Sequence, residues 1–238
     1  MLPLLRRISH LVELPAQDAQ ALTQLATPKR HFPADTDLVR EGDAPIGLFV
    51  VLDGVLCRYR ITPDGRRQIL AFILPGDFCG IHDSLVHRMD HAIGTIAAAS
   101  VSIVLHEKLL NALCQSPSIS AALRWSSLQE QSIEREHMVS LGRRNAHARI
   151  ACLMCEMFWR LGAVGLCDGN EVHLPMTQTD LADALGLTPI HVNRVLQDFR
   201  KERLITLNRN RLRLLDFERL VQIAGVSRDY LHLDGRAG

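Results

Sequence analysis

The amino-acid sequence predicts an α+β protein made of an N-terminal double-stranded, jelly-roll-like β-roll, a long helix and a C-terminal winged helix-turn-helix. Three observations predict this order. Short apolar runs separated by turn residues occupy residues 29–104, a helical pattern occupies 105–161, and two short helical patterns joined at Gly186 precede a pair of short strands. We expect a β-roll sensor domain at 1–117, a dimerisation helix at 118–142 and a DNA-binding domain at 143–238.

The N-terminal part begins with one predicted amphipathic helix, which follows Leu14-Pro15 and runs over residues 16–26. The β-roll is predicted from short strands that end at Glu-Gly-Asp, Asp-Gly or Pro-Gly-Asp turns, where glycine permits a positive φ angle. The expected strands are 38–39, 48–52, 55–61, 68–74 and, after a gap, 93–104.

A long helix is predicted after the β-roll, with Ser118 as its N-cap. Because residues 129–137 are almost wholly polar, the heptad register is poor, and periodicity alone does not establish a dimerisation helix. Gly142–Asn145 interrupts the helical pattern, which resumes over 146–161. We therefore expect a hinge at 142–145, between the β-roll with its dimer helix and the DNA-binding domain.

The most informative motif lies between residues 176 and 215. Thr177 or Thr179 can cap a first helix, and Gly186 ends it. Thr188-Pro189 then opens a second helix, with proline in its first turn. The apolar residues of the second helix fall on one stripe, formed by Val192, Val195, Leu196 and Phe199. This is the pattern of a helix-turn-helix, whose second helix enters the major groove of DNA by its N-terminal residues.

Charge supports this interpretation locally. The whole chain carries a formal net charge of +1, but residues 186–213 hold seven basic and two acidic side chains. Such a local excess is typical of a DNA-binding module on a larger body, whereas the alternative is an ordinary solvated helix face. Ile205–Leu207 and Leu212–Leu214 flank Asn208–Arg211, which predicts a hairpin with asparagine at positive φ and arginines on a phosphate backbone.

Composition narrows the class of protein further. The chain is 47% hydrophobic, enough for a full core, and has no apolar run of the roughly 18 residues that span a membrane. The N-terminus lacks the residue order of a secretory signal, and the six cysteines are scattered. We expect a soluble, cytoplasmic protein with reduced thiols and no membrane partner. No G-x-S-x-G or Walker motif occurs, so no enzyme is predicted.

Five short motifs together carry a family resemblance. They are Glu41-Gly42-Asp43, Leu52-Asp53-Gly54 and Leu74–Phe78 in the β-roll, and Leu185–Thr188 and Asn193–Leu196 in the DNA reader. In this order and spacing the chain resembles a Crp–Fnr-type transcription regulator, built on a cyclic-nucleotide-binding-like fold, over nearly its whole length. The resemblance implies a homodimer on a palindromic operator in double-stranded DNA, with an effector or redox signal acting at the β-roll and, in an activator, contact with RNA polymerase.

Two departures from the family pattern concern the signal. Nucleotide-binding members hold ribose and phosphate with a Gly-Glu and, further along, an Arg-Ser/Thr; here Ile81 stands at the Glu and His91-Ala92 at the Arg-Ser/Thr. Without that carboxylate and that bidentate arginine, we do not expect tight cAMP binding. The first cysteine is Cys57, so the N-terminus also lacks the cysteine cluster of the oxygen-sensing, iron–sulfur members.

The resemblance also places the DNA-reading residues. Arg194 matches the arginine that family members aim at guanine or phosphate. Ile190 replaces a glutamate that commonly reads cytosine, and Asn193 replaces a serine or glycine, so a thymine methyl group and an adenine are their expected partners. The predicted DNA-contacting set, in which Gln178, Thr179, Arg209 and Arg211 contact phosphates, is Gln178, Thr179, Thr188, Ile190, His191, Asn193, Arg194, Arg209 and Arg211.

Two clusters are candidates for sensing chemistry. The predicted effector pocket is formed by Cys79, Gly80, Ile81, His82 and His91. Some family members hold haem through a cysteine or histidine in this region, with an N-terminal proline reaching in, and Pro3 is available for that role. The alternative is that these histidines are surface residues on a loop.

Cys152-x-x-Cys155, followed by Cys167 and His173, resembles a zinc ligand set or a redox-active pair. Cysteines within an apolar helix more typically behave as small buried hydrophobes, and we assign no metal. The alternative function of the chain is a small-molecule or haem-binding sensory module whose helix-turn-helix serves protein interaction.

Overall fold

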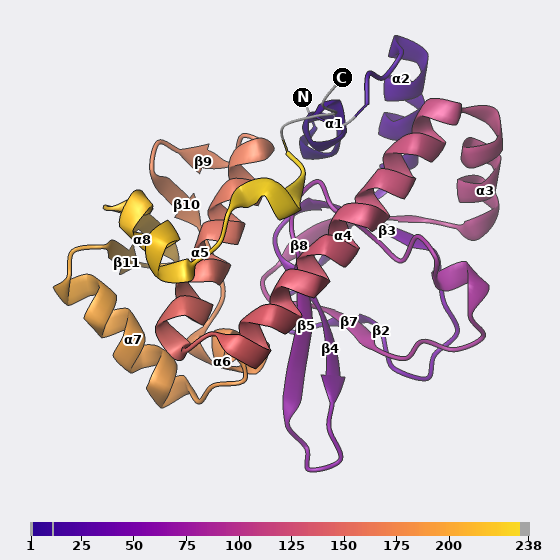
Figure 1. Cartoon of the computed structure of the whole chain (residues 1–238). Coiled ribbons are helices and arrows are strands. Elements are labelled where there is room, and N and C mark those ends of the chain that lie inside the picture. Colours follow the sequence, from indigo (N-terminus) through magenta and orange to yellow (C-terminus); the bar gives the residue numbers. More distant parts are fainter. Residues whose placement is uncertain (1, 11, 234–238) are drawn as a thin grey trace.

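The computed structural model describes residues 2–10 and 12–233 (Figure 1). Two four-stranded antiparallel sheets form the predicted β-roll. Apolar residues from both sheets, among them Val51, Leu56 and Val101, meet in the core between them. The first sheet has the order β1 (Lys29–Phe32), β8 (Ala99–Val104), β3 (Leu48–Asp53), β6 (Phe78–Cys79), and the second β2 (Asp37–Val39), β7 (Ala92–Thr95), β4 (Leu56–Ile61), β5 (Arg67–Ile73).

The turns of the β-roll follow the predicted Gly-Asp and Asp-Gly pattern. Gly54, between β3 and β4, has a φ angle of +82°, and a Cβ atom there would lie 2.4 Å from the carbonyl oxygen of Ala98. Glycine is therefore required at this turn. The prediction of one strand over 93–104 was wrong, because the chain leaves β7 after Thr95 and enters the other sheet as β8. A short 3-10 helix, η1 (Asp83–Leu85), follows β6.

Helices flank the β-roll on both sides in the sequence. The predicted helix near residue 16 is α2 (Ala16–Leu25), but the sequence prediction missed α1 (Pro3–Ser9), which buries Leu4 and Ile8. After the β-roll come α3 (His106–Gln115) and the long α4 (Pro117–Arg143), which crosses Figure 1 diagonally. The prediction of Ser118 as the cap was wrong, because Ser116 accepts the N–H of Ile119 at 3.0 Å, ahead of Pro117 in the first turn.

The C-terminal part holds the predicted winged helix-turn-helix with additions. The sheet of the wing has the strand order β11-β12-β10-β9, and the sequence did not predict β9 and β10. None of the helices among the described residues is long and apolar enough to cross a membrane. The elements are α5 (Ala146–Ala163), β9 (Cys167–Asp168), β10 (Glu171–His173), α6 (Gln178–Leu185), α7 (Pro189–Lys201), β11 (Ile205–Asn208), β12 (Arg211–Leu214), α8 (Phe217–Ala224) and the 3-10 helix η2 (Arg228–Leu231).

One hydrophobic core joins the β-roll to the winged helix. It contains Ile69 and Phe72 of β5 together with Leu153 of α5 and Leu181 of α6, and it continues into the stripe of α7. Figure 1 shows the same arrangement, with α5 and α6 beside the β4–β5 hairpin. The break between α4 and α5 falls within the predicted hinge at 142–145, but the core holds α5 directly against β5 of the β-roll.

Arg149 of α5 also bridges this break. Its Nε atom donates to the carbonyl oxygen of Arg144 at 2.9 Å, and its two Nη atoms donate to the carbonyl oxygens of Leu141 at 2.8 Å and Leu185 at 2.9 Å. The end of α4 and the end of α6 are thus held by one guanidinium, which no pattern in the sequence indicates.

A buried ionic group fastens α1 to the β-roll and to α5. Asp77, in the turn after β5, is 4% exposed, and one carboxylate oxygen pairs with Arg7 of α1. The other oxygen lies 2.5 Å from an Nη atom of Arg160 of α5 and accepts the N–H of Leu74 at 2.8 Å. Three segments far apart in the sequence therefore converge on one carboxylate.

This ionic group continues toward η2. Arg160 also pairs with Glu156 at 2.8 Å, and the hydroxyl of Tyr230 donates to Glu156 at 3.2 Å. Burial and the neighbouring Glu156 raise the pKa of Tyr230, which keeps it a donor. Gln129 of α4, fully buried, accepts from Arg7 and donates to the carbonyl oxygen of Leu231.

Candidate nucleic-acid interface

The first helix of the motif, α6, is held by a capping box. The side-chain oxygen of Thr177 accepts the N–H of Asp180 at 3.1 Å, and the Asp180 carboxylate accepts the N–H of Thr177 at 2.8 Å. Thr177 is therefore the cap, and Thr179 lies exposed in the first turn beside Gln178. Gly186 ends α6 with a φ angle of +61°.

The second helix, α7, begins as predicted. The side chain of Thr188 accepts the N–H of His191 at 3.2 Å, and Pro189 occupies the first turn. The whole predicted stripe is buried: Val192, Val195, Leu196 and Phe199.

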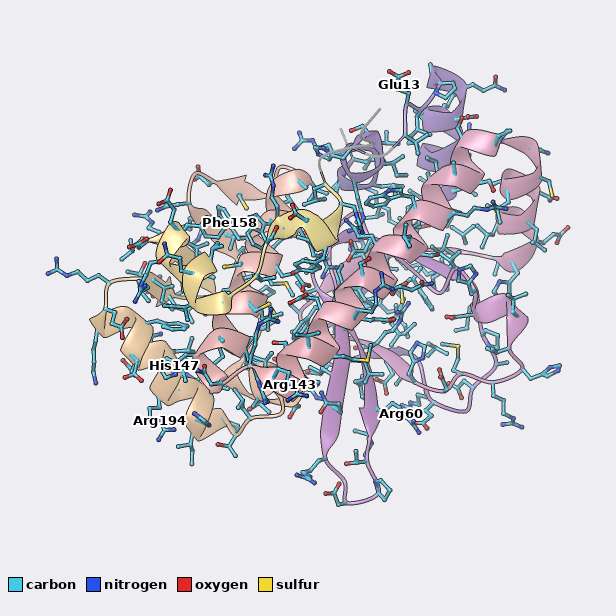
Figure 2. All side chains as sticks on the ribbon, in the orientation of Figure 1. Glu13, Arg60, Arg143, His147, Phe158 and Arg194 are labelled. Carbon is cyan, nitrogen blue, oxygen red and sulfur yellow. The ribbon has the colours of Figure 1, made fainter. Side chains whose placement is uncertain are left out.

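The opposite face of α7 is free of the core. Ile190 is 84% exposed, Asn193 and Arg194 are exposed, and His191 is half-buried. Figure 2 shows Arg194 projecting outward from α7. Gln197, one turn further along the same face, is also exposed and was missed, although its spacing from Asn193 and Arg194 could have revealed it. Exposed polar side chains in the first turns of a recognition helix can reach base edges in the major groove.

The wing has the hairpin geometry that was predicted, with one difference. Arg209 and Asn210 both have positive φ angles, +47° and +65°, as a two-residue turn between β11 and β12 requires. Asn210 was expected there, but Arg209 takes the position expected of Asn208. The carbonyl oxygen of Asn210 accepts the N–H of Leu174 at 2.7 Å, which ties the tip of the wing to the segment before α6.

Glu171 of β10 changes the electrostatics of the wing. Its two carboxylate oxygens each lie 3.0 Å from a nitrogen atom, one of Arg211 and one of Arg213. The hydrogen bond from Arg211 is the main cause that lowers the pKa of Glu171, and the hydrogen bond from Arg213 lowers it further. Arg211, a predicted phosphate contact, and Arg213 therefore share an acidic partner, whereas Arg209 lies exposed at the turn.

The predicted effector residues do not line one open site. Cys79 has no exposed surface, and burial raises the pKa of its thiol to about 12. His82 is exposed, while the Nδ1 atom of His91 lies 2.6 Å from the Asp90 carboxylate, and Ile81 is half-buried. A haem could not reach Cys79 without opening the β-roll.

The remaining residues of this cluster are held by close packing. Gly80 has a φ angle of +88°, and a Cβ atom there would lie 2.6 Å from the Asp83 carboxylate. Pro3, the predicted N-terminal ligand, lies in α1 against the Pro-Gly-Asp turn, where its carbonyl oxygen would be 3.0 Å from a Cβ atom at Gly76.

An ion pair within the chain joins the β-roll to α4. Arg58 of β4 is largely buried, pairs with Glu130 of α4 and lies 3.7 Å from Glu134. Cys79 lies close enough to Arg58 for the guanidinium to oppose, in part, the rise of the thiol pKa caused by burial. Arg58 could not be predicted from the sequence, because a lone arginine in a strand carries no signal of an inward-facing side chain.

The other cysteine cluster is a part of the core. Cys152 and Cys155 are buried in the middle of α5, and burial raises the pKa of each thiol to about 12. Within residues 2–10 and 12–233, no group of three or more cysteine, histidine or acidic side chains is placed to hold a metal ion. Cys167 and His173 lie outside α5, in β9 and β10.

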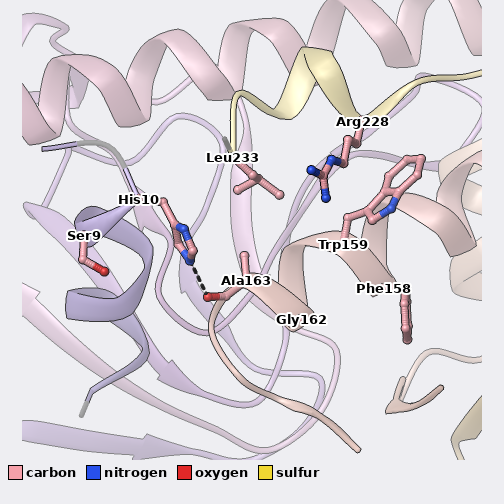
Figure 3. Close-up of a pocket in the computed structure, with 8 residues that line it drawn as sticks. All are labelled: Ser9, His10, Phe158, Trp159, Gly162, Ala163, Arg228 and Leu233. Carbon is pink, nitrogen blue, oxygen red and sulfur yellow. Dashed lines mark hydrogen bonds between the residues drawn. The ribbon is translucent and has the colours of Figure 1, made fainter. Parts of the chain in front are cut away.

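A cavity of about 610 Å³ lies where α1, the end of α5 and η2 meet (Figure 3). Trp159 and Arg228 stand on one side of it, and the Nε2 atom of His10 lies 3.0 Å from the carbonyl oxygen of Ala163 on the other. None of the predicted effector residues lines it.

Comparison with known proteins identifies the two parts of the chain. Residues 29–116 match the family model of the cyclic nucleotide-binding domain, and residues 148–223 match that of the Crp-like helix-turn-helix domain. The nitrogen fixation regulation protein FixK of Bradyrhizobium diazoefficiens is 32% identical over 196 residues, which cover 82% of this chain and 81% of FixK. This chain belongs to the Crp–Fnr family of transcription regulators.

Other relatives of this Crp–Fnr regulator agree. The transcriptional activatory protein AadR of Rhodopseudomonas palustris is 29% identical over 214 residues, covering 89% of this chain and 87% of AadR. The structure of FixK2 from Bradyrhizobium japonicum has a TM-score of 0.76 at 27% identity, covering 84% of this chain and 98% of FixK2. A CooA mutant from Carboxydothermus hydrogenoformans shares the fold, with a TM-score of 0.67 at 17% identity, 83% of this chain and 87% of that one.

Proposed function

We propose that this Crp–Fnr regulator binds, as a homodimer in the cytoplasm, an inverted-repeat operator that α7 reads with Ile190, Asn193 and Arg194. The exposed N-terminal face of α7, opposite a fully buried stripe, carries this proposal. In this proposal residues 1–117 receive the signal, 118–142 dimerise and 143–238 bind DNA. Contact with RNA polymerase follows if the protein is an activator.

The surface of α4 supports dimerisation. Exposed residues recur along it at intervals of four and three: Arg124, Leu128, Gln131, Arg135 and Met138. An average spacing of 3.5 residues suits two helices that wind around each other in a left-handed coiled coil. Leu128 and Met138 are large apolar side chains exposed in the single chain, and a partner helix would cover them.

The Arg58–Glu130 ion pair supports DNA binding without cAMP. The ion pair connects the β-roll to α4 through side chains of this chain alone. By the family resemblance, Ile81 replaces the ribose-binding carboxylate and His91 the phosphate-binding arginine. We infer that cAMP has no charged site here. Calorimetry with cAMP tests this, and micromolar or tighter binding would contradict it.

Operator selection from a random DNA pool tests the proposed function. Sequences enriched by the wild-type protein should form an inverted repeat. Arg194→Ala should weaken binding to that repeat by about 1–3 kcal/mol and relax the preference at one position, whereas Arg211→Ala should weaken cognate and random DNA alike. No enrichment, or equal losses on both DNAs for both variants, would contradict the assignment.

A further inference from the structure

The β4–β5 hairpin reaches from the β-roll to the first helix of the DNA-reading motif. At its end, Arg67 presents its Nε atom 2.7 Å from the Asp183 carboxylate and an Nη atom 2.5 Å from the Asp180 carboxylate. The amide of Gln68 donates to the carbonyl oxygen of Ala184 at 3.3 Å. All three partners lie on α6, so one guanidinium meets two carboxylates spaced three residues apart on one helix.

The chemistry of this contact favours a defined geometry. Two carboxylates on two edges of a planar guanidinium restrict its position more than a single pair does. The contact is also partly shielded from water, because the side chain of Arg67 is 27% exposed. The side chain of Arg66, the neighbouring residue, is 83% exposed and pairs with Asp64 of its own hairpin at 2.6 Å.

The contact acts on the helix that carries the recognition helix. Asp180 also belongs to the capping box of α6, and α6 and α7 pack on each other through the shared core. A cavity of about 620 Å³ separates the hairpin from the turn between α6 and α7, with Thr62 on one wall and Thr188 on the other. Beside that cavity, Arg67 forms the ion pairs from the hairpin to the motif, Gln68 adds one hydrogen bond, and the reading face of α7 stays exposed.

We propose that Arg67 is a positioning residue that sets the angle of the DNA-reading motif on its own β-roll, and thereby the half-site spacing that the dimer accepts. This inference rests on the proposed binding of a homodimer to an inverted repeat. One inserted base pair turns a half-site by about 34° and moves it by about 3.4 Å along the DNA axis. A motif held at a fixed angle cannot follow that displacement, whereas a loosened motif can.

The experiment measures the affinity of the full-length protein for the selected operator and for operators whose centre is lengthened or shortened by one base pair. Fluorescence anisotropy serves for wild type, Arg67→Gln, Asp183→Asn, Arg67→Lys and the matched control Arg66→Gln. Wild type and Arg66→Gln should prefer the selected spacing by about tenfold or more. Arg67→Gln should bind the selected operator about fivefold more weakly and reduce the preference to about threefold or less, with Asp183→Asn and Arg67→Lys in between.

Thermal unfolding of each variant identifies a loss of fold, and Asp183→Asn, which leaves the capping box intact, provides the test if Arg67→Gln does not fold. A folded Arg67→Gln with the spacing preference of wild type would overturn the inference. Wild-type protein that binds an inverted repeat at all spacings equally would overturn it too, while leaving the proposed function intact. Wild-type protein without sequence preference would overturn both.

Discussion

The substitution Asp77→Asn should be among the most destabilising substitutions in this protein that keep the shape of the side chain. The asparagine has nearly the same shape, so the packing of the turn after β5 is kept and only the negative charge is lost. Asp77 is 4% exposed, and it faces two buried guanidinium groups, Arg7 at 7% and Arg160 at 6% exposure. Without the carboxylate, these two cations lie in the interior with one acidic partner removed.

The magnitude follows from what each arginine retains. Arg160 keeps Glu156 at 2.8 Å and a hydrogen bond to the carbonyl oxygen of Phe72 at 3.1 Å. Arg7 keeps the neutral amide of Gln129. Removing one member of a buried ion pair costs about 3–5 kcal/mol, and here the charge is shared by two arginines, so we expect at least the lower end of that range. Since a domain is stabilised by about 5–15 kcal/mol, this loss is a large part of the total.

Urea unfolding, followed by tryptophan fluorescence at one fixed protein concentration, measures this change. The matched control is Asp64→Asn, which removes the partner of Arg66 on the hairpin surface, where both side chains are at least half exposed. The control should change the free energy of unfolding by less than about 1 kcal/mol. A loss below about 1 kcal/mol for Asp77→Asn, at unchanged denaturant slope, would refute the reasoning that Asp77 compensates two buried cations.

Three further outcomes are expected. Burial lowers the pKa of His137 below its ordinary 6.5, so on acidification the unfolded chain takes up a proton at this residue before the folded chain does. The free energy of unfolding should therefore fall as the pH drops below about 6.5, and it should fall less steeply in His137→Gln. Parallel pH profiles of the two proteins would contradict this. Glu171→Gln should release Arg211 and Arg213, raising affinity for any DNA and steepening its salt dependence by roughly one to two charges; unchanged titrations in several salt concentrations would show that the wing does not touch phosphate. A thiol reagent should label the exposed Cys114 of the native protein well before the buried thiols, with early labelling of α5 as the contrary result; the buried ones are Cys57, Cys79, Cys152 and Cys155.

Local signals in the sequence predicted those parts of the fold that short-range chemistry determines. Thr177, Gly186 and Thr188-Pro189 mark helix ends through hydrogen bonds and backbone angles within a few residues, and each has the role expected. In contrast, α1 has seven residues, too few to be stable alone, and depends on burying Leu4 and Ile8 against the β-roll. Strand β10 likewise exists through its pairing with β12, which no local pattern reveals.

The same distinction applies to the site. The exposed face of α7 could be predicted, since it is the complement of an apolar stripe with helical spacing. The neutralising effect of Glu171 could not, because it depends on the register that places Glu171 opposite Arg213. Arg67 and Asp180 are 113 residues apart, and only the packing of the hairpin against α6 brings them together. Long-range ion pairs of this kind hold the β-roll and the winged helix, each predicted from the sequence, in contact with each other.

The break between α4 and α5 is therefore not the free hinge that its sequence suggests. Gly142 and its polar neighbours indicate a hinge, and the helix does end there. Yet Arg149 holds carbonyl groups on both sides of the break, and the core of the winged helix continues into β5. Under the proposed function, a signal that turns the DNA-reading motif would have to break the ion pairs of Asp77 and Arg67 before any rotation at the break could follow. These ion pairs, rather than the flexibility of a linker, would under the same proposal set the free-energy difference between reading and non-reading states.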